Sequence, residues 1–161
     1  MPPGYAGRMS PEARLTELGI VLPPPREPGA SYLPHKQVGQ LLYLAGQGCR
    51  EAGGPLLTGR LGEDVDVAEG ARRARLAALM LLTTAREALG TLDRVESVVK
   101  LTGMVNATSD FVEHPAVVNG ASDLFIEVFG DAGRHPRSAF GVATLVRNAT
   151  VEIDVILQVR D

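Results

Sequence analysis

The chain has 161 residues, a formal net charge of −3 at pH 7 and one cysteine, Cys49, a length that fits a single domain able to bury a core without disulfides. Its acidic balance, its lack of tryptophan and its aromatic content of only 4% argue against a nucleic-acid partner, which would require a basic face and stacking rings. There is no charged leader with an apolar segment after it and no long apolar run, so we expect a cytoplasmic protein without a membrane partner.

Residues 1–29 are expected to form an extension that precedes the main domain, residues 30–161. Within the extension, residues 1–8 are interpreted as a frayed leader, and a short helix follows them. The N-cap, first-turn and stop signals of this helix are Ser10, Pro11 and Gly19. Residues 21–29 are rich in proline, which lacks an N–H donor and fixes φ, so they predict an extended connector along the surface.

Apolar periodicity predicts four strands and two long helices in the main domain. The strands are expected at residues 40–47, 94–107, 138–146 and 149–159. The helices are expected at residues 66–90 and 115–130. Asp66, three residues before Glu69, predicts a capping box at the start of the first long helix. The last two strands are expected to pair as a hairpin that turns around Arg147 and Asn148.

This order of elements indicates an α+β fold in which a mostly antiparallel sheet carries two long helices. Two helices can cover only one face of such a sheet. The expected strands contain more apolar residues than one covered face can hold, namely Val98, Leu101, Met104, Phe140, Val142, Ile153 and Ile156. We therefore expect the other face to pack on copies of the same chain, in a closed homo-oligomer with sites near the subunit seams.

Residues 134–142, RHPRSAFGV, place basic side chains directly before an apolar strand. Ala139 and Gly141 share one face of that strand with Arg137, as does Ala143, so small residues leave a hollow beside the guanidinium. Such a hollow suits a small carboxylate, because two parallel N–H donors of arginine match its two oxygens. Alternatively, the small residues let a helix approach the sheet closely and Arg137 is a solvated edge residue. The spacing alone leaves both interpretations open.

The same region resembles the closing segment of the Rid family, the reactive intermediate deaminases, also called YjgF-like proteins. The run HPRSAFGVATLVRNATVEIDVIL contains the Arg-Ser pair, the short apolar strand, the turn and the Val-Glu-Ile of that family. Upstream, SYLPHKQVGQLLYLAGQ is similar to the family segment that ends in Ser-Gly-Gln, LGTLDRVESVVKLTGMV to its central strand, and VVNGASDLF to its second helix. The resemblance covers nearly all of residues 30–160, and the residues before it fit a longer branch of the family.

The resemblance implies a homotrimer with the chorismate mutase-like fold, sites between subunits, and no metal or cofactor. It implies an enzyme that hydrolyses small enamine and imine acids to 2-keto acids and ammonia. Arg137 would then hold the substrate carboxylate, and Glu152 would orient the attacking water or pass its proton. The same resemblance assigns the rest of the substrate-binding site to Tyr32, Ala45, Gly46, Asn119 and Ala139.

Two positions depart from the family pattern. Ala45 stands where the deaminases commonly carry serine, and Ala139 where they carry cysteine, so we expect a larger and less polar pocket, with a different substrate or a lost activity. The expected hairpin also raises a geometric difficulty. It places Glu152 opposite about Gly141, roughly 13 Å along the strand from Arg137 at ~3.3 Å per residue. Long side chains, a bulge or separate seams for the two residues would resolve it.

Three functions are compatible with these features: enamine or imine hydrolysis, binding of a small carboxylate by a non-catalytic regulatory trimer, and an endoribonuclease activity sometimes attributed to the family. The acidic balance disfavours the third. Only the hydrolase needs Glu152, whereas hydrolase and binder share Arg137. Cys49 as a nucleophile would need a nearby base. Neither a base nor a set of metal ligands is indicated by the spacing of the histidines, His35, His114 and His135.

Overall fold

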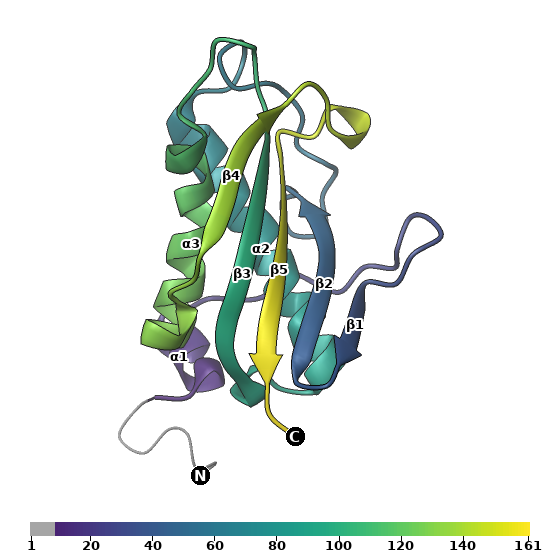
Figure 1. Cartoon of the computed structure of the whole chain (residues 1–161), viewed down its shortest axis with the longest axis vertical. Helices are drawn as coiled ribbons and strands as arrows, with labels where there is room; N and C mark the ends of the chain where they lie inside the picture. Colours follow the sequence, from purple (N-terminus) through teal and green to yellow (C-terminus); the bar gives the residue numbers. More distant parts are fainter. Residues whose placement is uncertain (1–8) are drawn as a thin grey trace.

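A computed structural model of the chain describes residues 9–161 and shows a five-stranded sheet with two long helices on one face (Figure 1). The strand order is β1-β2-β5-β3-β4, and all neighbouring strands are antiparallel except β3 and β4. The strands are β1 (His35–Val38), β2 (Leu41–Gly48), β3 (Val95–Asn106), β4 (Arg137–Val142) and β5 (Val151–Val159). The predicted α+β architecture with a mostly antiparallel sheet is confirmed.

Three α-helices accompany the sheet, namely α1 (Pro11–Glu17), α2 (Val67–Leu89) and α3 (His114–Phe129). The expected end signals are in place except for the Glu69 half of the capping box, because the Glu69 carboxylate pairs with Arg72 and Arg73 of its own helix. The Ser10 side chain caps α1, and the Asp66 carboxylate accepts a hydrogen bond of 2.8 Å from Glu69 N at the start of α2. Gly90 ends α2 with a left-handed φ of 80°. The expected frayed leader, residues 1–8, lies outside the described residues. None of the described helices has the length and apolar character needed to span a bilayer.

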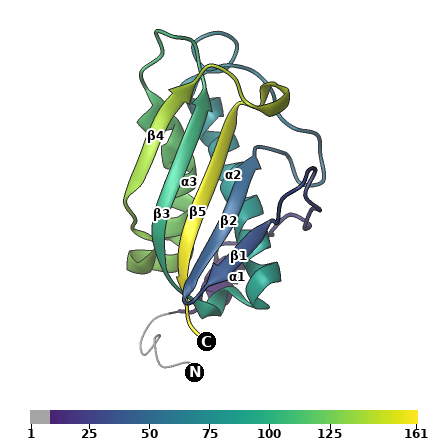
Figure 2. The same cartoon turned by 45° about the vertical axis from the view of Figure 1, so that its right-hand side comes forward.

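The expected hairpin between the last two strands is wrong. β4 pairs in parallel with β3, and β5 lies between β2 and β3 in the middle of the sheet (Figure 2). The succession β3, α3, β4 is a strand-helix-strand crossover, which returns the chain parallel to β3. Turn residues such as Arg147 and Asn148 specify a change of direction, not the partner of the next strand, and in the central position β5 forms hydrogen bonds along both edges. β1, paired with β2, is a further strand that the sequence did not indicate.

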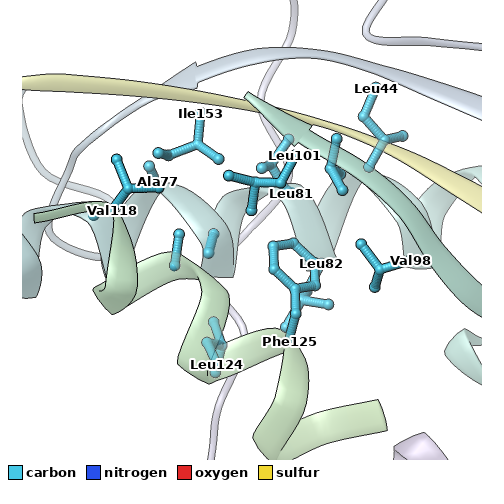
Figure 3. Close-up of a cluster of buried hydrophobic side chains, with 14 of the residues drawn as sticks. Leu44, Ala77, Leu81, Leu82, Val98, Leu101, Val118, Leu124, Phe125 and Ile153 are labelled. Carbon is cyan, nitrogen blue, oxygen red and sulfur yellow. The ribbon is translucent and has the colours of Figure 1, made fainter. Parts of the chain in front are cut away.

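The core lies between the sheet and the helices α2 and α3 (Figure 3). Side chains from both layers meet there, among them Leu81, Leu82, Leu101, Phe125 and Ile153. The two helices approach each other closely at Gly120, where a Cβ would overlap with the carbonyl group of Ala71. The Asn119-Gly120 pair therefore serves helix packing instead of marking a turn.

The apolar strand residues divide between the two faces of the sheet. Those that are buried in the helix-side core are Val98, Leu101 and Ile153. Those that alternate with core residues and face away from the helices are Met104, Phe140, Val142 and Ile156. Tyr43 pairs with Ile156 on this second face, where Tyr43 and Phe140 are 42% and 43% exposed. The face opposite the helices thus carries an apolar patch, although a smaller one than the sequence suggested.

The proline-rich connector forms neither helix nor strand, as the sequence predicts. Thr83 Oγ1 of α2 donates a hydrogen bond of 2.8 Å to Pro23 O, which holds the connector along that helix. At α1, the Arg86 guanidinium donates to both carboxylate oxygens of Glu12, at 3.0 and 2.6 Å. The extension is therefore attached to α2 at two places, and it leads directly to residues 26–34 at the edge of a cavity.

Candidate functional site

The residues expected to form one site lie in two separate places in the protomer. The first group lines a cavity where β2 ends and β5 begins, and consists of Tyr32, Ala45, Gly46 and Glu152. The second group lies on α3 and the edge strand β4, and consists of Asn119, Arg137 and Ala139. The expected position of Glu152 opposite Gly141 is wrong because no hairpin forms. Glu152 pairs instead with Met104 of β3.

The cavity has a volume of about 690 Å³, which is within the usual range for small-molecule sites. Residues between 26 and 34 form one wall, and the short segment η3 (Val146–Asn148) between β4 and β5 contributes another side. The pairing of β2 with β5 shifts register between Leu44 and Gln47. A bulge of this kind redirects side chains next to a site, and here it coincides with the cavity-lining residues Ala45 and Gly46.

Glu152 lies directly against Gly46. A Cβ at Gly46 would overlap with Glu152 Oε1, so glycine leaves the space that the carboxylate occupies. Partial burial raises the pKa of Glu152 above its ordinary value of 4.5, and the negative charge of Asp154 adds to the effect. Within residues 9–161, no side chain forms a hydrogen bond or ion pair with Glu152. A half-buried carboxylate without a protein partner is able to accept a proton from a bound water.

Arg137 points toward the helices and away from the cavity. Its Nη1 donates to Ser122 Oγ at 3.0 Å and its Nη2 donates to Pro115 O at 3.1 Å, both on α3. Ser122 Oγ is 3.0 Å from His135 Nε2, and His135 Nδ1 is 2.6 Å from Gly133 O. A carbonyl oxygen can only accept, so Nδ1 carries the proton and Nε2 accepts from the Ser122 hydroxyl. This chain of hydrogen bonds fixes the guanidinium at the edge of the sheet.

The hydrogen-bond chain requires a neutral His135. Burial lowers the pKa of His135 below its ordinary value of 6.5, and the positive charge of Arg137 lowers it further, against the opposing effect of the bond to Gly133. Protonation would put an N–H donor at Nε2, where the Ser122 hydroxyl now donates. No sequence pattern points to Ser122 for this role, and for His135 the sequence suggests only a positive charge beside Arg134, which its neutral, half-buried ring does not supply. The signal for His135 is its position two residues before Arg137, since alternate residues of an extended segment share a face.

The hollow expected beside Arg137 is filled within the protomer. A Cβ at Gly141 would overlap with the ring of His114, and Ala139 packs against the core. The small residues therefore let α3 approach the sheet, as the alternative interpretation proposed. Arg137 is nevertheless anchored by α3 and not simply solvated. Asn119 is exposed on the same helix.

Other candidate groups contribute little to a site in this protomer. Cys49 is fully buried, with its Sγ 3.4 Å from Leu57 O, so it is not placed to attack a substrate. Over residues 9–161, no three His, Cys, Asp or Glu side chains come together in a way that could hold a metal ion. The cavity is also lined by three arginines that no sequence motif indicates, Arg26, Arg50 and Arg147.

The chain is similar to known proteins in both sequence and structure. The sequence matches the family described as "YjgF/chorismate mutase-like, putative endoribonuclease" over residues 12–157. It is 41% identical over 157 residues to Protein TCP17 of Trypanosoma cruzi, with 97% of each chain covered. A solved structure from Agrobacterium tumefaciens, of unknown function, is 44% identical with a TM-score of 0.85, over 93% of this chain and 92% of that one. A "putative endoribonuclease" from Shewanella oneidensis is 34% identical with a TM-score of 0.90, over 94% and 100% of the two chains.

Proposed function

Because the chain belongs to the YjgF/chorismate mutase-like family, also called the Rid family, we propose that it hydrolyses small enamine and imine acids to 2-keto acids and ammonia. The observation that carries this proposal is the Glu152 carboxylate, which lies beside Gly46 in a cavity of small-molecule size and has a raised pKa. A carboxylate in such a setting suits proton transfer to and from water.

The proposed reaction requires few chemical groups from the protein. An enamine acid first becomes the imine by gaining a proton at carbon and losing one at nitrogen, and water then adds to the carbon of the C=N bond. Glu152 accepts a proton from that water as the C–O bond forms and passes it to the nitrogen. The hydroxyl proton of the resulting carbinolamine then moves to the nitrogen, again by way of Glu152, and the C–N bond breaks to release ammonia and form the carbonyl of the keto acid. One water is consumed without any oxidation or reduction, so positioning the water and the carboxylate supplies much of the acceleration.

The substrate carboxylate is assigned to Arg137 of a neighbouring subunit. Arg137 and Glu152 lie on opposite faces of the sheet, so one small acid cannot contact both of them in the same protomer. A homotrimer that brings β4 and α3 of one subunit to the cavity of the next would join the two groups. The apolar patch opposite the helices supports such an assembly. In this arrangement one subunit contributes Asn119 and Arg137, whereas Ala139 stays packed against its own core, and the other subunit contributes Tyr32, Ala45, Gly46 and Glu152.

A non-catalytic trimer that binds small carboxylates is the alternative. It is favoured by Ala45 and Ala139, which lack the hydroxyl and the thiol that the family resemblance leads one to expect, and it keeps the role of Arg137. The endoribonuclease description belongs to the matched family and to the Shewanella relative. For this chain a net charge of −3 disfavours binding along an RNA backbone.

The test compares wild type with Glu152→Gln in two measurements. The first follows keto acid release from 2-aminoacrylate generated in situ, and the second measures binding of 2-oxobutyrate by calorimetry. Loss of the proton acceptor should slow turnover by about 10²–10⁴-fold, while binding through Arg137 changes little. Unchanged turnover in the variant would remove Glu152 from the mechanism. Tight binding by wild type with no turnover above the spontaneous rate would establish the binder instead.

A further inference from the structure

Three arginines line the cavity that holds Glu152, namely Arg26, Arg50 and Arg147. They come from three distant segments, since Arg26 lies in the connector, Arg50 follows β2 and Arg147 lies in η3. The acidic residues of the same lining are Glu27 and Glu152. The cavity therefore has an excess of positive charge in a chain whose net charge is −3.

These three side chains differ from the other arginines of residues 9–161. Each of the others forms an ion pair or donates a hydrogen bond to a protein group, as Arg72 does with Glu51 and Arg137 with Ser122. Within the described residues, Arg26, Arg50 and Arg147 have no such partner. Their guanidinium donors are therefore available to a ligand.

Like charges also lie close together here. Partial burial lowers the pKa of Arg50, and the nearby charges of Arg26 and Arg147 lower it further. All three guanidinium groups nevertheless stay charged, because an arginine side chain keeps its proton at any physiological pH. Their mutual repulsion costs free energy that a bound anion would relieve, and a guanidinium offers the parallel donors that carboxylates and phosphates accept.

The backbone at Arg147 is held in an uncommon conformation. Arg147 and Asn148 have φ values of 50° and 59°, in the left-handed region that residues other than glycine seldom adopt. The buried Asn106 stabilises this turn, because its Nδ2 donates to Asn148 Oδ1 at 2.9 Å and to Ala149 O at 3.1 Å. Strained conformations of this kind concentrate at ligand sites, and this one presents Arg147 to the cavity.

We propose that Arg26, Arg50 and Arg147 bind the distal acidic group of a dianionic 2-keto or imino acid whose reacting end lies at Glu152. This inference rests on the proposed function and narrows its substrate class. Arg137 of the neighbouring subunit would hold the carboxylate next to the reacting carbon, so the arginine cluster serves a second acid, either a carboxylate or a phosphoryl-type group. It also gives the N-terminal extension a role, since the connector supplies Arg26.

The experiment measures affinity by calorimetry for three 2-keto acids. 2-Oxobutyrate has no distal acid, 2-oxoglutarate has a distal carboxylate, and phosphonopyruvate has a distal phosphonate. The variants are Arg26→Gln, which is exposed and should not disturb folding, and Arg50→Gln. Arg75→Gln removes the same charge from an ion pair with Glu127 in the helix layer and is the matched control.

Wild type should bind at least one dianion about tenfold or more tightly than 2-oxobutyrate, and each cavity variant should lose most of that preference. The better dianion identifies the distal group as carboxylate or phosphonate. Arg75→Gln should bind as wild type does. The inference is overturned if wild type shows no preference or no binding, or if the cavity variants weaken all three ligands equally. A wild type that prefers a dianion but turns over no imine would contradict only the proposed function. A wild type that turns over imines without preferring a dianion would contradict only this inference.

Discussion

Arg137 and Glu152 project from opposite faces of one sheet. Arg137 pairs with Leu101 and donates a hydrogen bond to Ser122 of α3, on the helix side of the sheet. Glu152 pairs with Met104 and alternates along β5 with residues that are buried on the helix side, so it faces the other way. β3 separates them, and they are out of register by three residues, about 10 Å along a strand at ~3.3 Å per residue. Two groups proposed to act on one small acid can therefore do so only across a contact between subunits. Assembly and activity should be lost together.

We expect Phe140→Asp to dissociate the proposed trimer and abolish turnover. Phe140 is 43% exposed on the face opposite the helices, and an unpaired charge in an apolar contact costs about 3–5 kcal/mol. Sedimentation should give a wild-type mass near three times 17.1 kDa and a variant mass near one. Val112→Asp changes an equally apolar but 76% exposed residue outside the sheet and should sediment as wild type does. A wild type that stays monomeric at micromolar concentration would contradict the assembly. Ile153 cannot replace Phe140 in this test, because it belongs to the core.

Gly46→Ala should reduce turnover while leaving the fold intact. The added Cβ would overlap with Glu152 Oε1, so the carboxylate must move away from its position in the cavity. A displacement of this size in a proton-transfer group costs on the order of 10²-fold in rate. Gly29→Ala is the control, because Gly29 lines the same cavity but has open space around its Cβ position. Equal rates for the two variants in the coupled deaminase assay would show that the place of Glu152 beside Gly46 is unimportant.

Ser122→Ala should weaken binding of 2-oxobutyrate about threefold to tenfold. It removes the acceptor for Arg137 Nη1 and leaves His135 Nε2 without its donor, so the guanidinium is less well held. Calorimetry on the assembled protein measures the change. Thr84→Val is the control, since it also removes a nearly buried hydroxyl from a long helix, one that bonds only its own helix at Met80 O. If the two variants bind alike, Ser122 does not position Arg137.

Glu152→Gln should stabilise the protein at pH 7. The pKa of Glu152 is raised in the folded state, so the carboxyl group favours folding when protonated, and that contribution is lost as pH rises through the folded pKa. Below the ordinary value of 4.5 the group is protonated in both states, and the variant should then have no advantage. The measurement is the denaturant midpoint of wild type and variant at pH 4 and pH 7. A gain of equal size at both pH values would have to come from something other than ionisation of Glu152.

Helices were easier to predict here than strand partners. The start and end of α2 depend on Asp66 and Gly90, residues that act within one turn of the chain, and both are where the sequence places them. The neighbour of β4 depends on the crossover through α3, which joins segments about thirty residues apart. The alternating pattern of β5 fits a hairpin arm as well as a central strand, so no local signal separates the two.

In the candidate site, too, short continuous motifs could be predicted from the sequence, whereas the arrangement of distant segments could not. The motifs around Arg137 and Glu152 could be recognised because each is a short continuous stretch. Their separation in the protomer could not, since it follows from the position of β3 between β4 and β5. The cluster of Arg26, Arg50 and Arg147 has no sequence pattern at all, because a connector, a strand end and a turn contribute one residue each.

The central position of β5 bears on how the protein can be made. β5 comes last among the described strands, yet it alone joins the β1-β2 pair to the β3-β4 pair. On the ribosome, β2 and β3 therefore emerge with unpaired edges, and the apolar sides of α2 and α3 stay partly uncovered until residues 151–159 follow. Such intermediates expose the surfaces on which chains aggregate. We therefore expect a stalled nascent chain that lacks residues 151–159 to remain unfolded and to depend on chaperones.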